Sequence, residues 1–483
     1  MTKMAFQISY KAIRFKPGYE VKEDIVIPTF NRGKDWLLGA LEEEQEVVRG
    51  AIFVAKPVEF GNMDKNVWLD TQGAHVLYIM GKRRSGKSYT LGVLAEGLAL
   101  SERKQAILIF DTMNVFWTLE HPVDSFKDVE EARNLYEWGI EKFKEKLNVK
   151  CYYIRGVEGY YPPQYYRLTL KASELEGEDW ASLFGKDVFS DPIGQLLAEL
   201  VESVSSEGYQ SGKEKIPPNP EYNIDDMLFC LEKNPSILRY ESKTIEAVRR
   251  YLKAIKRIGI FSDKGINIHE IFAPGQVSVL LLRDLDPLIR GLVVGIIVKK
   301  IMHFRAIGSD YEKREALARQ MKGLPNQERE KKLEQIKKTL GKGLPRGWIL
   351  IDEAQNYIPN VGIIASKNPL IKYINEGRNI GLSIAAATQR PSGLDSSIVR
   401  NASVLAIHSM SMGEDIVEAK NMLNSYPIEE FDCDGKKVDK QVFDRLIRSL
   451  KKGYAVFSDE MANRIFVAKI RPRLTMHGGG EVW

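Results

Sequence analysis

A glycine-rich loop at residues 81–88 constrains the fold more than any other part of the sequence. The apolar run Val76 to Met80 precedes the pattern Gly-x4-Gly-Lys-Ser, and the apparent helix LGVLAEGLAL follows it. Gly81 and Gly86 permit the backbone angles of a tight loop, so that the following backbone N–H groups point at one spot. This order of strand, loop and helix predicts a phosphate-binding P-loop. The alternative is a chance glycine turn, and the strand and helix on either side argue against it.

Two residues at the end of this loop carry groups suited to a nucleotide phosphate and its metal ion. Lys87 would reach the β- and γ-phosphates, and the Ser88 hydroxyl is a hard oxygen ligand for Mg²⁺. Backbone N–H groups at the helix start add partial positive charge. The predicted nucleotide-binding residues are Gly81, Lys82, Arg83, Arg84, Ser85, Gly86, Lys87, Ser88 and Tyr89.

The composition is that of a globular protein without a membrane span or a disulfide framework. With 483 residues, of which 44% are hydrophobic and 28% charged, there is room for two or three domains. Cys151, Cys230 and Cys433 lack the CxxC spacing of zinc sites, and the histidines form no metal-binding motif. The longest apolar run, residues 292–298, is far below bilayer length, and the N-terminus has no secretory signal. We therefore expect a cytoplasmic protein.

Positive charge is concentrated in one region, although the net charge is only +5. Residues 312–346 contain eleven Lys or Arg and five Glu, a surplus of six that leaves the rest of the chain near −1. Such a region favours contact with DNA phosphates. Helix-spaced pairs such as Glu334 with Lys338 also fit an ordinary solvated helix. The candidate DNA-binding residues in this region are Lys331, Lys332, Lys337 and Lys338.

The remaining sequence predicts an α/β protein with a mostly parallel sheet, a small N-terminal β-rich domain and a helical insertion. Short β-like runs separated by turn residues fill the first 73 positions, beginning with Ala5 to Tyr10. From Ala74, apolar strands alternate with helical segments, as a parallel sheet covered on both faces requires. The expected domains are 1–73, then 74–171 with 265–469 as the ATPase domain, 172–264 as the insertion, and 470–483 as the tail.

Several elements of this pattern are expected at defined positions. One helix should span about Val129 to Leu147, and another should follow the strand near Val277 and run through Phe304. Residues 453–469 read as a terminal hairpin. The last residues, RPRLTMHGGGEVW, have no periodic pattern and are expected to form a tail that packs on a neighbouring subunit.

The last helix expected in the insertion is amphipathic. Ile245, Val248, Leu252 and Ile255 form its apolar face. Its basic residues offer a second candidate DNA-binding surface, and an ordinary solvated surface is the alternative. These basic residues are Arg249, Arg250, Lys253, Lys256 and Arg257.

An acidic pair follows another apolar strand, in the segment WILIDE at residues 348–353. In open parallel sheets, ligands bind at this carboxyl edge of the strands. Asp352 would hold Mg²⁺ with Ser88, directly or through water, and Glu353 would activate the lytic water as a general base. Acidic strand ends are common, but the pair combined with the preceding P-loop predicts an ATPase with ATP and Mg²⁺ as cofactors.

Two further residues suit the remaining roles in phosphoryl transfer. Gln389 ends a buried strand with a neutral donor and acceptor, which suits it to sense the γ-phosphate or to orient water. If Arg378 is remote from its own P-loop, it can reach nucleotide only across a subunit boundary, as an arginine finger. The alternatives are a polar strand end and an ordinary surface arginine. The predicted catalytic residues are Lys87, Glu353, Gln389 and Arg378.

Three segments together resemble the HerA family of the HerA/FtsK superfamily. They are residues 81–88, WILIDEAQNYIP at 348–359, and EGRNIGLSIAAATQRPSGLDSSIVRNA at 376–402. The resemblance covers most of residues 46–483, and the RPR-x4-HGGG tail is similar to archaeal members. The basic P-loop interior, Lys82 to Arg84, departs from the small residues common in the family.

The resemblance implies a homo-hexameric ring of RecA-like motors with a small N-terminal β-barrel, a helical insertion and a C-terminal brace. Such rings translocate double-stranded DNA. By position, the Walker A pair is matched by Lys87 and Ser88, the Walker B pair by Asp352 and Glu353, the sensor by Gln389 and the finger by Arg378.

Three functions stay open at this point. The leading hypothesis is an ATP-driven translocase or helicase on duplex DNA, serving for example DNA end processing with a NurA-like nuclease. The second is a HerA-like ring that acts as an assembly platform or regulator for a partner effector. The third is a DNA-transfer motor for conjugation or import, which the lack of a membrane anchor in the sequence weakens.

Overall fold

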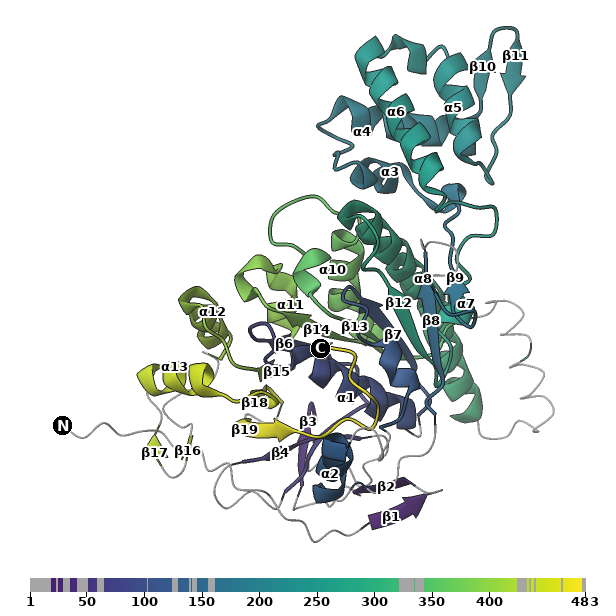
Figure 1. Cartoon of the computed structure of the whole chain (residues 1–483). Coiled ribbons are helices and arrows are strands. Elements are labelled where there is room, and N and C mark those ends of the chain that lie inside the picture. The colour runs from purple at the N-terminus through teal and green to yellow at the C-terminus, as the bar shows by residue number, and fades with distance from the viewer. Residues whose placement is uncertain are drawn as a thin grey trace.

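One large sheet organises most of the chain in the computed structural model (Figure 1). The structure describes residues 19–22, 25–28, 35–40, 51–58, 65–101, 103–123, 129–138, 140, 146–154, 161–320, 334, 343–423, 432–433, 436–437, 440–461 and 464–479. The early run predicted at Ala5 to Tyr10 lies outside these residues.

Within the described residues the sheet has 13 strands. In spatial order they are β3 (Trp36–Leu38), β5 (Val67–Leu69), β4 (Ile52–Pro57), β19 (Arg464–Ile470), β18 (Tyr454–Asp459), β15 (Val404–Ile407), β6 (Val76–Met80), β14 (Leu382–Thr388), β13 (Gly347–Ile351), β7 (Ala106–Asp111), β12 (Val277–Leu281), β8 (Val149–Tyr153) and β9 (Tyr166–Arg167).

The sheet is parallel from β15 to β9 and mostly antiparallel beyond β15. Every neighbouring pair from β15 to β9 runs in the same direction. By contrast, β18, β19 and β4 pair antiparallel, and β18 with β19 forms the expected terminal hairpin. The predicted α/β fold with a mostly parallel sheet is therefore confirmed.

Both faces of the parallel part are covered along β6, β14, β13, β7 and β12, where every residue is buried, which explains why these strands are mostly apolar. Along β6, Val76, Tyr78 and Met80 belong to one buried cluster, whereas Leu77 and Ile79 belong to the other. The helices that contribute to the second cluster are α1 (Lys87–Leu100) and α2 (Val129–Glu137). The helices that contribute to the first include α8 (Pro287–Gln320), α10 (Lys367–Glu376), α11 (Ser396–Asn401), α12 (Gly413–Leu423) and α13 (Lys440–Ser449).

A helical unit projects from one end of the sheet, above α8 in Figure 1. Its elements are α3 (Gly177–Leu183), α4 (Pro192–Glu202), α5 (Ile224–Lys233), α6 (Ser242–Ile258) and the hairpin of β10 (Tyr209–Ser211) and β11 (Glu214–Ile216). The chain then returns to the sheet through α7 (Ile268–Ile271), and α3 packs against α8. The sequence pattern did not predict the β10–β11 hairpin.

The N-terminal strands join the large sheet instead of pairing only among themselves. Strand β4 bonds to β19 on one side and to β5 on the other. A separate hairpin consists of β1 (Tyr19–Lys22) and β2 (Ile25–Pro28), and a second short one of β16 (Asp432–Cys433) and β17 (Lys436–Lys437).

Two helices differ in length from their sequence-based predictions. Helix α8 continues past Phe304 to Gln320 and so includes the start of the basic region. Helix α2 ends at Glu137, ten residues before the predicted end at Leu147. No helix in the described part of the chain combines the length and apolar character that a bilayer span needs.

Candidate nucleotide-binding site

The P-loop leaves β6 through two glycines in conformations that other residues rarely adopt. Gly81 has a φ of +155° and Gly86 a φ of +121°. A Cβ atom at Gly81 would lie 2.7 Å from both the Cβ of His408 and the Oγ of Ser85. Replacement of Gly81 would therefore displace the buried support beneath the loop.

The three basic residues inside the loop lie on the surface, whereas Lys87 is buried. Lys82, Arg83 and Arg84 are exposed, and the Lys82 backbone N–H donates to the Ser409 carbonyl at 2.8 Å. Lys87 Nζ donates to the Lys82 carbonyl oxygen at 3.1 Å. Burial lowers the pKa of Lys87, although the nearby carboxylates oppose this shift.

Strand order brings the P-loop and the acidic pair to the same edge of the sheet. Strand β14 lies between β6 and β13, and all three are parallel. The residues that follow these strands are therefore neighbours at their carboxyl ends. Gln389 follows β14, so it lies between the P-loop and the Asp352–Glu353 pair.

The first contact between these elements joins Ser88 to Asp352. Ser88 Oγ donates a hydrogen bond to Asp352 Oδ2 at 2.7 Å. Burial raises the pKa of Asp352 to about 6. A hydroxyl and a carboxylate oxygen side by side are the hard ligands that Mg²⁺ prefers, so these two residues fit the predicted metal site.

The second contact orients Glu353 through two amide side chains. Gln389 Nε2 donates to Glu353 Oε1, and Gln355 Nε2 donates to Oε2 at 2.8 Å. Thr388 Oγ1 in turn donates to Gln355 Oε1 at 2.7 Å. Gln355 was not among the predicted residues. The signal that could have found it is its position two residues after Glu353.

Asp111, at the end of β7, shapes the loop on the other side of the acidic pair. Its carboxylate accepts hydrogen bonds from the backbone N–H groups of Met113 at 3.1 Å and Phe116 at 2.8 Å. Burial, together with the charge of nearby Asp352, raises the pKa of Asp111 to about 7. The bonds to Asp111 fold this loop over the site and bring Met113 and Val115 to its wall.

These elements enclose a cavity of about 570 Å³ at the carboxyl edge of the sheet. The predicted residues that line it are Arg83, Arg84, Gly86, Lys87, Ser88, Tyr89, Asp352, Glu353 and Gln389. Gly81 and Ser85 support the loop from beneath, and Lys82 lines a neighbouring cavity of about 450 Å³. Residues that sequence reasoning missed also line the nucleotide cavity, namely Met113, Val115, Lys452, His477 and Gly479. Sequence reasoning assigned them no role, although the HGGG tail that contains His477 and Gly479 was an available signal.

Arg378 lies at the opposite edge of the sheet from this cavity. It is exposed in the 3₁₀ turn Gly377–Ile380, which precedes β14, whereas Gln389 follows the same strand. A strand of seven residues separates the two positions by roughly 20 Å. Buried Arg305 fixes this turn, because its guanidinium donates to the carbonyl oxygens of Ile380 and Leu344. Arg378 is thus remote from its own P-loop, which is the condition for an arginine finger that acts at the nucleotide of another subunit.

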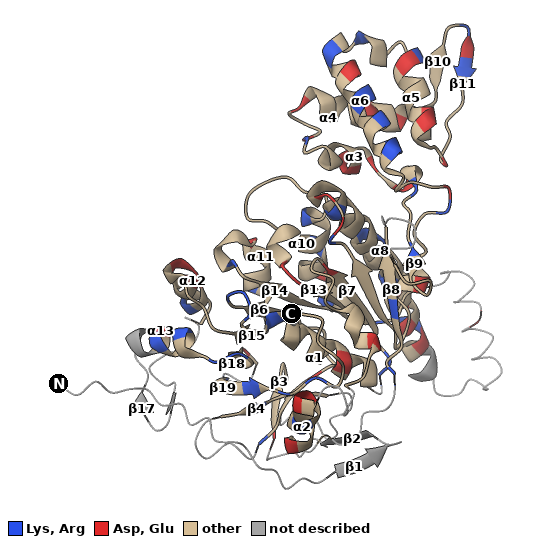
Figure 2. Ribbon diagram, viewed as in Figure 1, with Lys and Arg blue, Asp and Glu red and all other residues tan. Residues whose placement is uncertain are grey.

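The two candidate DNA-binding surfaces differ in what the structure describes. Lys331, Lys332, Lys337 and Lys338 lie outside the described residues. On α6, Arg249 and Arg250 form ion pairs with Glu246 at 2.7 and 3.2 Å, and Lys256 pairs with Asp225 at 2.5 Å. Figure 2 accordingly shows basic residues (blue) and acidic residues (red) mixed over α5 and α6. Lys253 and Arg257 complete the predicted set on this helix.

The fold and the site together define a P-loop ATPase of the RecA-like class. Residues 74–301 match the family model described as "Helicase HerA, central domain". These residues are thus similar to the central domain of HerA, and the resemblance found in the sequence is confirmed over this part. The comparison with curated proteins finds no match.

Solved structures with a similar fold are distant in sequence. VirB4 of Thermoanaerobacter pseudethanolicus aligns with 88% of this chain and 98% of its own, at 12% identity and a TM-score of 0.51. The plasmid coupling protein TrwB with ADP and Mg²⁺ aligns with 83% of this chain and 85% of its own, at 15% identity and a TM-score of 0.45. The genome packaging NTPase B204 of Sulfolobus turreted icosahedral virus 2 aligns with 82% of this chain and 97% of its own, at 10% identity and a TM-score of 0.30.

Proposed function

We propose that this protein hydrolyses ATP and uses the reaction to translocate double-stranded DNA, as one subunit of a homo-hexameric ring. The observation that carries the proposal is the meeting of three motifs in one cavity. There the Ser88 hydroxyl lies 2.7 Å from Asp352, and the amide of Gln389 bonds to Glu353. The match to the central domain of a helicase supports a nucleic acid motor.

Each side chain of the site has one task in this mechanism. The P-loop N–H groups and the Lys87 amine bind the β- and γ-phosphates. Mg²⁺, held by Ser88 and Asp352, would neutralise phosphate charge. Glu353, oriented by Gln355 and Gln389, takes the proton of the water that attacks the γ-phosphorus. The bond from phosphorus to the ADP oxygen then breaks, which leaves ADP and phosphate.

The ring is part of the proposal because Arg378 lies too far from the nucleotide cavity of its own subunit to act there. Arg83 and Arg84 line the cavity from the P-loop itself, while Arg378 lies at the far edge of the same subunit. In a ring of identical subunits, the far edge of one subunit faces the nucleotide edge of the next. Arg378 then supplies the finger that stabilises the transition-state charge.

The biological setting proposed is DNA repair in the cytoplasm, with a NurA-like nuclease as partner in end processing. The proposed domain division is residues 1–73, the ATPase domain 74–171 with 265–469, the insertion 172–264, and the tail 470–483. The ring would hold DNA through the segment bearing Lys331, Lys332, Lys337 and Lys338 rather than through α6. This segment is close in sequence to β13, so force on it reaches the hydrolysis site through few residues.

Binding to duplex DNA should weaken steeply as salt rises and should not depend on base sequence. Each neutralised phosphate contributes about 0.9 to the negative slope of log affinity against log salt. Replacing Lys331, Lys332, Lys337 and Lys338 with Gln should flatten this slope by about 3.6, if each contacts one phosphate, and abolish DNA stimulation of ATP hydrolysis. The measurement is fluorescence anisotropy of a labelled duplex over a salt series, with ATPase rates in parallel.

The set of basic residues on α6 serves as the matched comparison. Gln at Arg249, Arg250, Lys253 and Lys256 should leave the slope unchanged, because three of these four side chains already pair with carboxylates. An unchanged slope for both sets would place the DNA contacts elsewhere. If DNA did not stimulate the wild-type ATPase at all, the ring would instead act as an assembly platform for an effector.

A further inference from the structure

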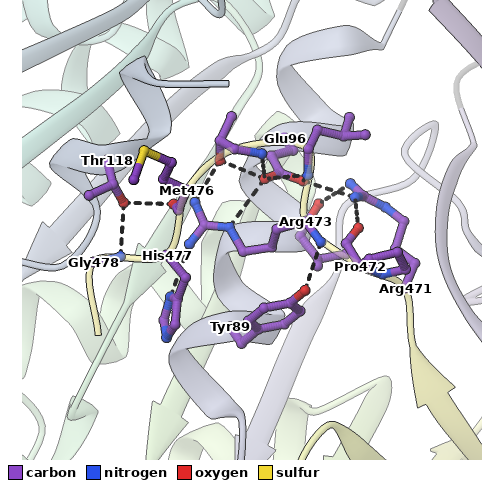
Figure 3. A network of polar contacts seen from close by, with 12 residues as sticks. Tyr89, Glu96, Thr118, Arg471, Pro472, Arg473, Met476, His477 and Gly478 are labelled. Atoms are coloured by element: carbon purple, nitrogen blue, oxygen red, sulfur yellow. Dashed lines mark hydrogen bonds and ion pairs between the residues drawn. The ribbon is translucent and has the colours of Figure 1, made fainter. Parts of the chain in front are cut away.

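The C-terminal segment Arg471 to Gly479, called the strap here, lies along the P-loop helix of its own subunit (Figure 3). Glu96 of α1 is fully buried and holds the strap at its centre. It accepts hydrogen bonds from Arg471 at 2.8 Å, from Arg473 at 3.1 Å and from the Thr475 hydroxyl at 2.7 Å. These contacts join the strap to a helix of its own subunit, and the expected packing of the tail on a neighbour stays a prediction.

A second anchor fixes the far end of the strap to the loop after β7. Thr118 Oγ1 donates to the Met476 carbonyl oxygen at 2.8 Å and accepts from the Gly478 N–H at 3.1 Å. A Cβ atom at Gly478 would lie only 2.7 Å from the Val115 carbonyl oxygen, so a glycine permits this close approach. The strap therefore connects α1 with the loop that covers the nucleotide cavity.

These anchors place His477 in the wall of the cavity. Its ring packs edge-on against Tyr89, with ring centroids 5.4 Å apart, and Gly479 lies beside it in the same wall. Arg473 lies 3.1 Å from His477 Nδ1. An arginine can only donate, so Nδ1 accepts this bond and the ring hydrogen lies on Nε2.

The histidine stays neutral at physiological pH. Burial, together with the charges of Arg473 and Lys452, lowers the pKa of His477 to about 4. A neutral imidazole is a weak ligand for a phosphate, which prefers charged donors. It suits a ribose or a base, which offer neutral acceptors and an apolar face.

The other residues of the cavity determine which part of a nucleotide reaches this wall. Lys87 and Ser88 fix the phosphates, and Glu353 marks the end at which the γ-phosphate is attacked. Tyr89 comes one residue after the phosphate-binding pair and turns its ring toward the strap. The nucleoside, at the opposite end of the molecule from the γ-phosphate, is therefore expected beside the wall that Tyr89 and His477 form together.

We propose that His477 binds the nucleoside part of the nucleotide through its Nε2–H, and that the strap is a positioning element that holds it there. This inference deepens the proposed function, because it rests on ATP as the ligand of the same site. It assigns nucleoside recognition to a segment almost 400 residues away from the P-loop in sequence.

The test compares a nucleotide with a ligand that carries phosphates but no nucleoside. Binding of ADP and of inorganic tripolyphosphate is measured by calorimetry for the wild type and for His477→Ala. Loss of one hydrogen bond and the ring contact should weaken ADP binding by about tenfold, and tripolyphosphate binding should stay within about twofold. His303→Ala, an exposed histidine on α8, is the matched control and should change neither.

Two conservative variants separate a specific contact from general packing. In His477→Gln, the side-chain amide can occupy the place of Nε2 and should restore ADP binding to within about threefold of the wild type. His477→Asn, whose amide reaches only the place of Nδ1, should not. Equal loss for both ligands, or an unchanged ADP affinity in His477→Ala, would overturn the inference. A wild type that binds neither ligand would instead contradict the proposed nucleotide site.

Discussion

At the scale of single residues, Glu353 is held in a geometry that suits one task. Its φ is 55°, in the left-handed region that costs a non-glycine residue roughly 1 kcal/mol or more. Two glutamine amides hold the two oxygens of its carboxylate. The carboxylate is thus oriented before nucleotide binds, at the edge where the γ-phosphate is expected.

Gln389→Ala should slow hydrolysis while nucleotide binding is retained. The substitution removes the amide that orients Glu353 and contacts the attacking water, so kcat should fall by about 10- to 100-fold. The affinity for ADP should change by less than about threefold, since the P-loop is untouched. Steady-state ATPase kinetics and calorimetry measure the two effects. Gln210→Ala, on exposed β10, is the matched control, and an equal kcat for both variants would remove Gln389 from the mechanism.

The sequence predicts site residues well where they belong to a contiguous motif. Asp352 and Glu353 directly follow β13, and Lys87 and Ser88 follow β6 after the glycine-rich loop, so neighbouring strand edges bring them together. His477 and the other missed lining residues lie in loops and in the tail, where the sequence indicates no periodic element and no role. Their place depends on long-range contacts, such as the bond from Thr475 to Glu96, that local patterns do not encode.

At the scale of elements, α1 has two roles. Its first turn presents Lys87 and Ser88 to the nucleotide, and Glu96, more than two turns later, clasps the strap. Arg471 and Arg473 are each only 3% exposed, so the buried charges of these two arginines and of Glu96 are stabilised by one another and not by water. Periodicity predicted α1 as a helix but not its partner, since the strap itself lacks a pattern.

Glu96→Gln should destabilise the protein strongly. The substitution leaves two buried arginines without a counter-charge, which costs on the order of 3 kcal/mol or more. Chemical denaturation should show this loss at pH 7. Glu130→Gln, an exposed residue on α2, should shift stability by less than about 0.5 kcal/mol. Equal stability of the Glu96 variant and the wild type would contradict a clasped strap.

The same pair of proteins should respond differently to acid. Burial alone would raise the pKa of Glu96, but Arg471, Arg473 and Thr475 hold it below its ordinary value of 4.5. Such a group contributes stability that is present above pH 4.5 and is lost as pH falls through its lower folded-state pKa. The stability difference between the wild type and Glu96→Gln should therefore shrink below pH 4.5. If the stability difference instead grew as pH falls, the pKa of Glu96 would be raised in the folded protein and not lowered.

Element lengths and sheet edges were harder to predict than element types. The parallel strands were evident because both faces are buried, so each strand is a continuous apolar run. Helix α8 exceeds its predicted end because it remains helical after its apolar pattern gives way to charged residues near Glu312. The pairing of β4 with β19 joins positions about 410 residues apart, which no local pattern indicates.

At the scale of the whole molecule, the two ends of β14 carry the two halves of the site that we propose is shared between subunits. Gln389 lies at the nucleotide edge and Arg378 at the far edge. In a ring, each nucleotide would then lie between the P-loop of one subunit and the arginine of the next. Hydrolysis at one interface could move the neighbour directly.

Mixing two inactive variants should restore part of the activity. Arg378→Ala subunits keep an intact P-loop, and Lys87→Ala subunits keep an intact finger. In rings mixed at equal amounts, about a quarter of the interfaces would pair the two intact parts. ATPase rates of the mixture should exceed those of either variant alone. Subunits that co-assemble but stay inactive would argue against a role in trans, and a stable monomer with ATP and DNA would contradict the ring.

The most direct test of the ATPase assignment is ATP turnover and ATP binding by Glu353→Gln. The proposed mechanism assigns this carboxylate as the base that activates water, with the phosphates held by other residues. We predict that the variant binds ATP within about threefold of the wild type while its turnover falls by at least about 100-fold. Turnover at the wild-type rate would show that Glu353 is not the base, and the mechanism proposed for this cavity would be wrong.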